Sequence, residues 1–206
     1  MKRKLLSCFL ICVTLVSALA VFTACGEEPA TYSNYVAIEV QDYGTIVIEL
    51  YRKMAPGTVY NFQKLVSQGF YDGLTFHRVV QGFMIQGGCP KGDGSGNAGQ
   101  TIPGEMMSNG FTQNTLKHTR GVVSMARNSS GYDTASCQFF IMTETNVNLD
   151  GEYAAFGKVL EGMDVVDAIS LVSTDNSEDN GVGGKPLEKI VMTRVYFLED
   201  YTPTVE

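Results

Sequence analysis

The chain has 206 residues, with 15 Lys and Arg against 22 Asp and Glu, so its formal net charge is −7 at pH 7. This acidic balance argues against a nucleic-acid partner, because phosphate binding needs clustered Lys and Arg. The length suits one domain with a sizeable hydrophobic core after an N-terminal extension.

The sequence of residues 1–24 is typical of a secretory signal. Basic residues at 2–4 precede an apolar run over residues 5–22, and a small residue stands directly before Cys25. The closing "FTAC" resembles a bacterial lipobox, in which the Cys is acylated and becomes the first residue of the mature protein; Phe22 departs from the commoner Leu or Val. An uncleaved transmembrane anchor is the alternative, because the run is near the minimum spanning length of about 18–20 residues.

Both interpretations place the basic end inside the cell and the rest of the chain outside it, held at the cell membrane. We therefore expect an extracytoplasmic protein with a lipid anchor at Cys25 and a short polar tether over residues 25–34. One folded domain follows over residues 35–201, and residues 202–206 form a C-terminal tail.

Of the five cysteines, Cys8 and Cys12 lie in the signal and Cys25 is the predicted lipidation site. The remaining pair, Cys89 and Cys137, is too small to be a disulfide framework, so the fold depends on its core. The two residues are compatible with a disulfide outside the cell or with free buried thiols.

The domain begins with a predicted β-hairpin over residues 36–50, because apolar residues alternate on both sides of Asp42, Tyr43 and Gly44. A helix is predicted next, with Pro56 in its first turn and Gly69 at its end. Its apolar residues recur at helical spacing and are Val59, Phe62, Leu65 and Val66.

Short β-rich runs dominate the rest of the domain, and one further helix is predicted over residues 163–171. The runs are residues 74–80, 83–86, 121–127, 138–143, 154–160 and 189–198. Many short strands with two helices predict a mainly β fold, a mostly antiparallel barrel or sandwich with helices over its openings.

Two loop motifs imitate known binding sites. "GSGNAG" at residues 94–99 matches the dinucleotide pattern G-x-G-x-x-G, but prolines flank it and no helix is predicted to follow, so a mobile surface loop over residues 87–104 is expected instead. "DNSEDNG" at residues 175–181 lacks the Gly and the final carboxylate of a calcium loop, so a solvated loop is expected.

Hydrolytic and metal chemistry lack the residues they need. The chain has two histidines, His77 and His118, too few with two cysteines for a convincing three-ligand metal site. No G-x-S-x-G motif occurs, and neither His stands in a recognisable triad context. We expect both to be structural, hydrogen-bonded histidines.

Four blocks, "FHRVVQGFMIQGG", "KHTRGVVSMAR", "SCQFFI" and "LDGEYAAFGKV", follow one another at separations similar to those of the cyclophilin family of peptidyl-prolyl cis-trans isomerases. The resemblance covers nearly all of the exported domain. It implies a closed eight-stranded antiparallel barrel capped by two α-helices. It also implies a monomeric enzyme that isomerises X–Pro bonds without a cofactor or a metal.

The resemblance also implies the site. Arg78 matches the catalytic arginine, and Gln86 matches a residue that orients it and bonds the substrate backbone. Ala126 and Arg127 match the strand that pairs with the substrate main chain, and Gln138 matches a polar lining residue. The residues that match the apolar proline pocket are Phe83, Met84, Phe140 and Leu149, with Tyr153 beside them.

Three positions depart from well-studied members. Arg127 stands where Asn is frequent, Asn148 where many eukaryotic members carry Trp, and Tyr153 where those members carry His. We expect the Asn148 change to weaken binding of cyclosporin-type ligands more than catalysis.

The expected function is isomerisation of proline-containing, unfolded or partly folded exported polypeptides near the membrane. The alternative is a cyclophilin-like module that holds proline-containing segments as a chaperone with little turnover. Arg78 favours the enzyme, because a pure binder would not need it. The clients and the preferred residue before proline are not encoded in any recognisable motif.

Overall fold

The structure is a computed structural model that describes residues 32–177 and 183–203. The predicted signal, Cys25 and the first part of the tether lie outside the described residues, as does most of the acidic loop at 175–181. Within the described part, none of the helices combines the length and apolarity that a membrane crossing requires.

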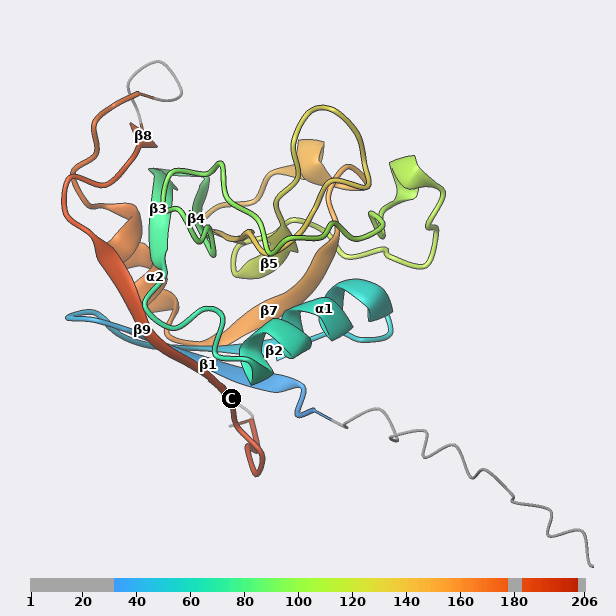
Figure 1. The fold of residues 1–206 in the computed structure, drawn as a ribbon, viewed down its shortest axis with the longest axis horizontal. Helices are drawn as coiled ribbons and strands as arrows, with labels where there is room; N and C mark the ends of the chain where they lie inside the picture. The colour runs from blue at the N-terminus through green and yellow to red at the C-terminus, as the bar shows by residue number, and fades with distance from the viewer. Residues whose placement is uncertain (1–31, 178–182, 204–206) are drawn as a thin grey trace, which may run out of the picture. The chain divides into compact units, whose positions relative to one another are not determined.

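Nine strands and two α-helices occur in the described residues (Figure 1). The strands are β1 (Tyr35–Val40), β2 (Gly44–Leu50), β3 (Thr75–Val80), β4 (Met84–Gly87), β5 (Val122–Met125), β6 (Phe139–Met142), β7 (Ala155–Glu161), β8 (Gly183–Gly184) and β9 (Ile190–Phe197). The helices are α1 (Pro56–Ser67) and α2 (Met163–Ser170), and 3-10 turns occur at Met107–Asn109 and Val147–Leu149.

Eight of these strands close into a barrel. Their hydrogen-bonded order is β4-β6-β5-β7-β2-β1-β9-β3, and β3 pairs with β4 to complete the ring. Every pairing is antiparallel. This confirms the predicted eight-stranded barrel with two helices. The additional strand, β8, pairs with the end of β3 beside the ring.

The hairpin and both helices form where local signals predicted them. Asp42 has a φ of 64° in the turn between β1 and β2, a left-handed conformation that Asp tolerates. Gly69, with a φ of 63°, follows the end of α1. Gly162 caps α2 where a Cβ would collide with the carbonyl of Thr45, so the close approach of α2 to β2 requires glycine.

The α1 N-terminus is capped from a distant loop. Ala55 provides no side-chain cap. The Glu105 carboxylate instead accepts hydrogen bonds from Gly57 N at 2.9 Å and Thr58 N at 2.7 Å. A buried carboxylate there satisfies two otherwise unpaired donors and favours the positive end of the helix dipole.

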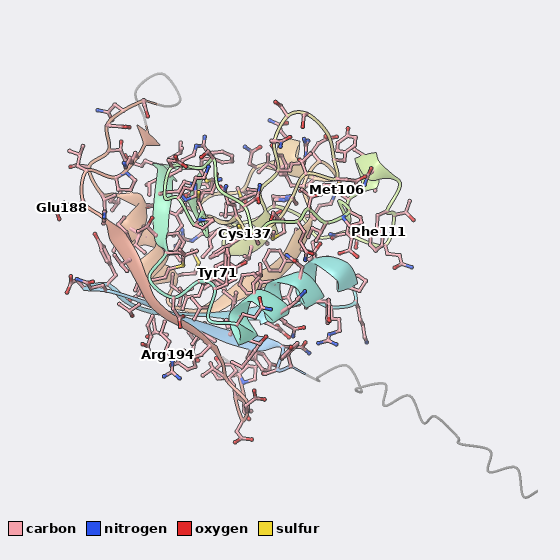
Figure 2. The ribbon with its side chains drawn as sticks, viewed as in Figure 1. Tyr71, Met106, Phe111, Cys137, Glu188 and Arg194 are labelled. Carbon is pink, nitrogen blue, oxygen red and sulfur yellow. The ribbon has the colours of Figure 1, made fainter. Side chains whose placement is uncertain are left out.

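The core fills the barrel, with Phe62 of α1 packed against Tyr71, Phe139 and Phe156. Figure 2 labels Tyr71 and Cys137 in the interior, where the Tyr71 hydroxyl donates to the Cys137 carbonyl at 3.0 Å. Cys89 and Cys137 are both buried and free. Burial raises the pKa of the Cys137 thiol to about 11.

Strands β5 and β6 are buried on both faces, which explains why their sequences do not alternate with polar residues. In β6, Phe139 and Ile141 belong to the barrel core, whereas Phe140 and Met142 belong to a second apolar cluster. Because successive side chains of a strand point to opposite faces, the second cluster lies on the outer surface of the barrel wall.

Candidate active site

The second cluster forms an apolar patch outside the barrel. Its buried members are Val80, Met84, Val122, Phe140, Met142 and Ala155, and its partly exposed members are Phe83, Leu116, Ala126, Leu149 and Tyr153. The structure therefore brings together all the apolar residues predicted to bind proline, with Met84 and Phe140 at the base and Phe83, Leu149 and Tyr153 more exposed. The Tyr153 ring stands edge-on to Phe140, at 5.7 Å between centroids.

Arg78 lies at the edge of this patch. The residue is half-buried on β3, opposite Gln86 of β4. Its NH1 nitrogen lies 3.7 Å from the Met84 sulfur and 3.5 Å from Gln86 Oε1. The second distance is long for a hydrogen bond, so Gln86 directs the guanidinium without holding it tightly.

A directional chain of side-chain amides orients Arg78. Gln138 Nε2 donates to the carbonyls of Gly94 at 2.7 Å and Gly96 at 2.8 Å, which turns its oxygen toward Gln86. Gln86 Nε2 donates to that oxygen at 3.0 Å, which turns Gln86 Oε1 toward Arg78. Each amide orientation follows from its neighbour, so Arg78 meets an acceptor.

The loop that carries Gly94 and Gly96 lies at the surface, as predicted, and is anchored to the interior at Cys89. Its start, Gly87, belongs to β4, and Gly96 N donates to the Cys89 sulfur at 3.2 Å. Burial would raise the pKa of the Cys89 thiol, but backbone N–H groups, that of Gly96 first, lower it overall. The prediction that no dinucleotide-binding helix follows residues 94–99 is confirmed.

Arg127 does not extend freely over the site. Its guanidinium carbon lies 5.0 Å from the Tyr132 ring centroid and 4.7 Å from that of Tyr153. Its Nε donates to the Glu152 carbonyl at 3.0 Å, and the Glu152 carboxylate lies 3.5 Å from NH2. Two ring faces and these contacts fix the side chain beside the patch.

Ala126 and Arg127, the two residues predicted to pair with the substrate main chain, differ in whether their backbone N–H is already used within the protein. Ala126 N already donates to the Gln138 carbonyl at 2.9 Å, so this donor is not offered to a peptide. The prediction then rests on the Ala126 carbonyl and the Arg127 main chain. Both residues line a cavity of about 200 Å³, together with Gln86, Gln138 and residues 94–97.

The sequence profile described as "Cyclophilin type peptidyl-prolyl cis-trans isomerase/CLD" matches residues 35–197. The chain belongs to the cyclophilin family. It is accordingly an enzyme, a peptidyl-prolyl cis-trans isomerase.

Named relatives agree with this assignment. Peptidyl-prolyl cis-trans isomerase B of Bacillus subtilis (strain 168) is 49% identical over 125 residues, which cover 61% of this cyclophilin and 82% of the relative. A peptidyl-prolyl cis-trans isomerase of Helicobacter pylori (strain ATCC 700392 / 26695) is 43% identical over 145 residues, covering 69% and 84%.

A solved structure is similar as well. A Cryptosporidium parvum cyclophilin type peptidyl-prolyl cis-trans isomerase, crystallised in the presence of the dipeptide Ala-Pro, superposes with a TM-score of 0.69 at 30% identity. The match covers 81% of this cyclophilin and 99% of that chain.

The two histidines of this cyclophilin have different environments. The expectation that both are hydrogen-bonded is wrong for His77, whose ring nitrogens are sealed from solvent and have no hydrogen-bond partner among the described residues. Burial lowers the pKa of His77. Because burying a neutral imidazole costs less than burying a charged one, burial favours the neutral ring.

His118 forms a chain of contacts that the sequence did not reveal. Its Nδ1 lies 3.2 Å from Asp150 Oδ1, and its Nε2 lies 3.1 Å from Ser124 Oγ. Burial lowers the pKa of His118, although the hydrogen bond with Asp150 acts in the opposite direction. Asp150 lies 32 positions and Ser124 six positions from His118, so no local sequence pattern indicated that the three residues meet.

Proposed function

We propose that this cyclophilin accelerates X–Pro isomerisation in exported polypeptides by stabilising the twisted amide, with Arg78 as donor and the apolar patch as the seat of the prolyl ring. The two isomers of an X–Pro bond differ by only about 0.5–1 kcal/mol, yet uncatalysed exchange takes roughly tens to hundreds of seconds. The barrier of about 18–20 kcal/mol is largely the loss of amide resonance on twisting.

The chemistry requires no covalent step. On twisting, the prolyl nitrogen regains its lone pair and becomes a hydrogen-bond acceptor, which it is not in the planar amide. A guanidinium keeps its protons at working pH and can donate to that lone pair. Because the interaction is stronger in the twisted state than in either planar isomer, it lowers the barrier.

The observation that carries the proposal is the position of one nitrogen. NH1 of Arg78 lies between Gln86 Oε1 at 3.5 Å and the sulfur of Met84, a member of the apolar patch, at 3.7 Å. A prolyl ring packed on the patch would bring its nitrogen near this donor. The Ala-Pro dipeptide named for the Cryptosporidium parvum neighbour supports a proline-containing ligand for this chain too.

Replacing Arg78 tests the mechanism. We expect Arg78→Ala to lower kcat/KM on a short X–Pro peptide about 10²–10³-fold, the usual loss when a transition-state donor is removed. Arg78→Lys keeps the positive charge but loses the planar guanidinium group. Its kcat/KM should therefore lie between those of the wild type and Arg78→Ala. The exposed Arg194→Ala is the matched control and should retain wild-type activity.

Peptide binding separates the enzyme from the binding module. Arg78→Ala should still bind the peptide, because the apolar patch is unchanged. If the wild type isomerises the peptide no faster than Arg78→Ala while both bind it, the chaperone alternative replaces the catalytic mechanism.

For localisation we propose a lipid anchor at Cys25 outside the cytoplasmic membrane, supported by the basic and apolar segments before it. The intact mass of membrane-extracted protein should equal residues 25–206 plus acyl chains. Cys25→Ser should lack the acyl mass. A membrane-bound protein that retains residues 1–24 would instead support the uncleaved anchor.

A further inference from the structure

We infer that His118 is a positioning residue for isomerisation, which ties the segment carrying Leu149 to the barrel wall beneath Phe140. The inference rests on the proposed function, because it assumes that the apolar patch seats the prolyl ring. Leu149 and Phe140 come from different elements, so their spacing depends on whatever connects those elements.

His118 holds both ends of the five-residue segment 146–150. Its carbonyl accepts a hydrogen bond from Asn146 N at 2.9 Å, and its own N–H donates to Asp150 Oδ1 at 2.8 Å. The ring adds a contact from Nδ1 to the same carboxylate oxygen at 3.2 Å. Leu149 lies between these two points, in the 3-10 turn Val147–Leu149.

The other side of the ring faces the barrel wall. Nε2 lies 3.1 Å from the Ser124 hydroxyl of β5, and Ser124 pairs in the sheet with Phe140 of β6. The imidazole is also stacked on Phe140, with 6.1 Å between centroids and 19° between planes, and stands edge-on to Tyr153. One buried side chain therefore contacts or supports three members of the patch.

The order Asp150, His118, Ser124 matches that of a hydrolase triad, but the site cannot act as one. The Ser124 side chain is fully buried in the barrel wall, and His118 is 1% exposed, so no substrate carbonyl reaches the hydroxyl. The three residues instead connect the segment 146–150 to the barrel wall. Their geometry assigns the proton of the neutral ring to Nδ1, facing Asp150, with Nε2 accepting from Ser124.

Two substitutions at His118 separate its two ring contacts. Asparagine places an amide near the position of Nδ1 and can still donate to Asp150, whereas glutamine places one near Nε2 and reaches Ser124 instead. We expect His118→Gln to weaken peptide binding about fivefold, which corresponds to roughly the contribution of one hydrogen bond, because the ring contact with Asp150 is lost. Its kcat should stay within about twofold of wild type. His118→Asn keeps the Asp150 contact but loses the contact with Ser124, so it should weaken peptide binding to a similar degree, because either loss breaks the connection between the segment and the barrel wall.

Asp150→Ala provides a second test that leaves the imidazole in place. It should weaken peptide binding to a similar degree as His118→Gln. Nitrogen-15 spectra of the ring should show the proton moving from Nδ1 toward Nε2, because its acceptor is lost. A Leu149 methyl resonance should shift in both variants.

Val195→Ala controls for general destabilisation, because Val195 is a buried core residue of β9 that is absent from the patch. It should leave the peptide affinity and the His118 ring spectrum unchanged.

Unchanged affinity in both His118→Gln and Asp150→Ala, or an equal loss in Val195→Ala, would overturn the inference. Failure of the proposed function would look different: the wild type itself would not isomerise the peptide, whereas the ring tautomer and the Leu149 shift would still report on the connection.

Discussion

At the residue scale, Asn148 gives a direct test of how this cyclophilin differs from Trp-bearing members. Its side chain is exposed, next to Leu149 of the apolar patch, and its backbone N–H donates to Asn146 Oδ1. A Trp there would add a large apolar surface for a ligand that spans the rim of the patch. We expect Asn148→Trp to tighten cyclosporin binding by at least about tenfold, with kcat/KM nearly unchanged, in an inhibition titration. A wild-type affinity already equal to that of Trp-bearing members would contradict the prediction.

Individual residues also show what the sequence could not predict. The motif blocks selected Arg78 and part of the apolar patch, but they did not select its members Val80, Leu116, Val122, Met142 and Ala155. The amide directions of Gln86 and Gln138 were not predictable, because they are set by carbonyls of Gly94 and Gly96, more than 40 positions before Gln138. The unpartnered ring of His77 and the clamped Arg127 likewise depend on long-range packing.

At the scale of single elements, the cap that Glu105 provides for α1 should contribute measurably to stability. Glu105 is 8% exposed, and its carboxylate accepts hydrogen bonds from two N–H groups of the first turn. Glu105→Ala should lower the free energy of unfolding by about 1–2 kcal/mol, because both donors lose a buried partner. Urea denaturation gives this difference, and the exposed Glu188→Ala is the matched control, which should stay within about 0.5 kcal/mol of wild type. A Glu105→Ala variant as stable as that control would show that water replaces the cap.

Local signals were sufficient for most elements. The predicted hairpin, both helices and the six other β-rich runs all contain observed strands or helices, with ends shifted by a few residues. Strand β8 was missed, because Gly183 and Gly184 carry no strand propensity and form a strand through pairing with Val79 and Val80 of β3. The Glu105 cap was missed for the same reason: its partners are remote in sequence.

At the scale of the whole molecule, the two histidines should make stability depend on pH. Burial lowers the pKa of both His77 and His118 below the ordinary value of 6.5. As the pH falls below about 6.5, the unfolded chain takes up protons that the folded chain resists, so the free energy of unfolding should decrease. Loss of stability from Asp150, whose folded-state pKa is lowered, begins at lower pH, below its ordinary value of 3.8.

Urea unfolding between about pH 7.5 and 5.0 measures this histidine-dependent loss. The double variant His77→Gln, His118→Gln should show a shallower dependence in the same range, whatever its stability at pH 7.5. An equal slope in both proteins would assign the dependence to other groups.

The closed barrel illustrates the limit of sequence patterns at this scale. Hydrophobic periodicity predicted many antiparallel strands but left barrel and sandwich open, because both bury alternating residues. The distinction depends on the pairing of β3 with β4 as well as with β9, which no local pattern records. The family resemblance resolved it by comparison with a known fold.

The alternation along β6 also guides directed evolution of this enzyme. Codons 140 and 142 encode side chains of the apolar patch outside the barrel, whereas codons 139 and 141 encode side chains of the barrel core. A library that randomises codons 140 and 142 and keeps codons 139 and 141 would vary the apolar patch without changing the side chains that fill the barrel. The complementary library, which randomises codons 139 and 141, should yield mainly misfolded clones. The two sets of codons alternate within one four-residue strand.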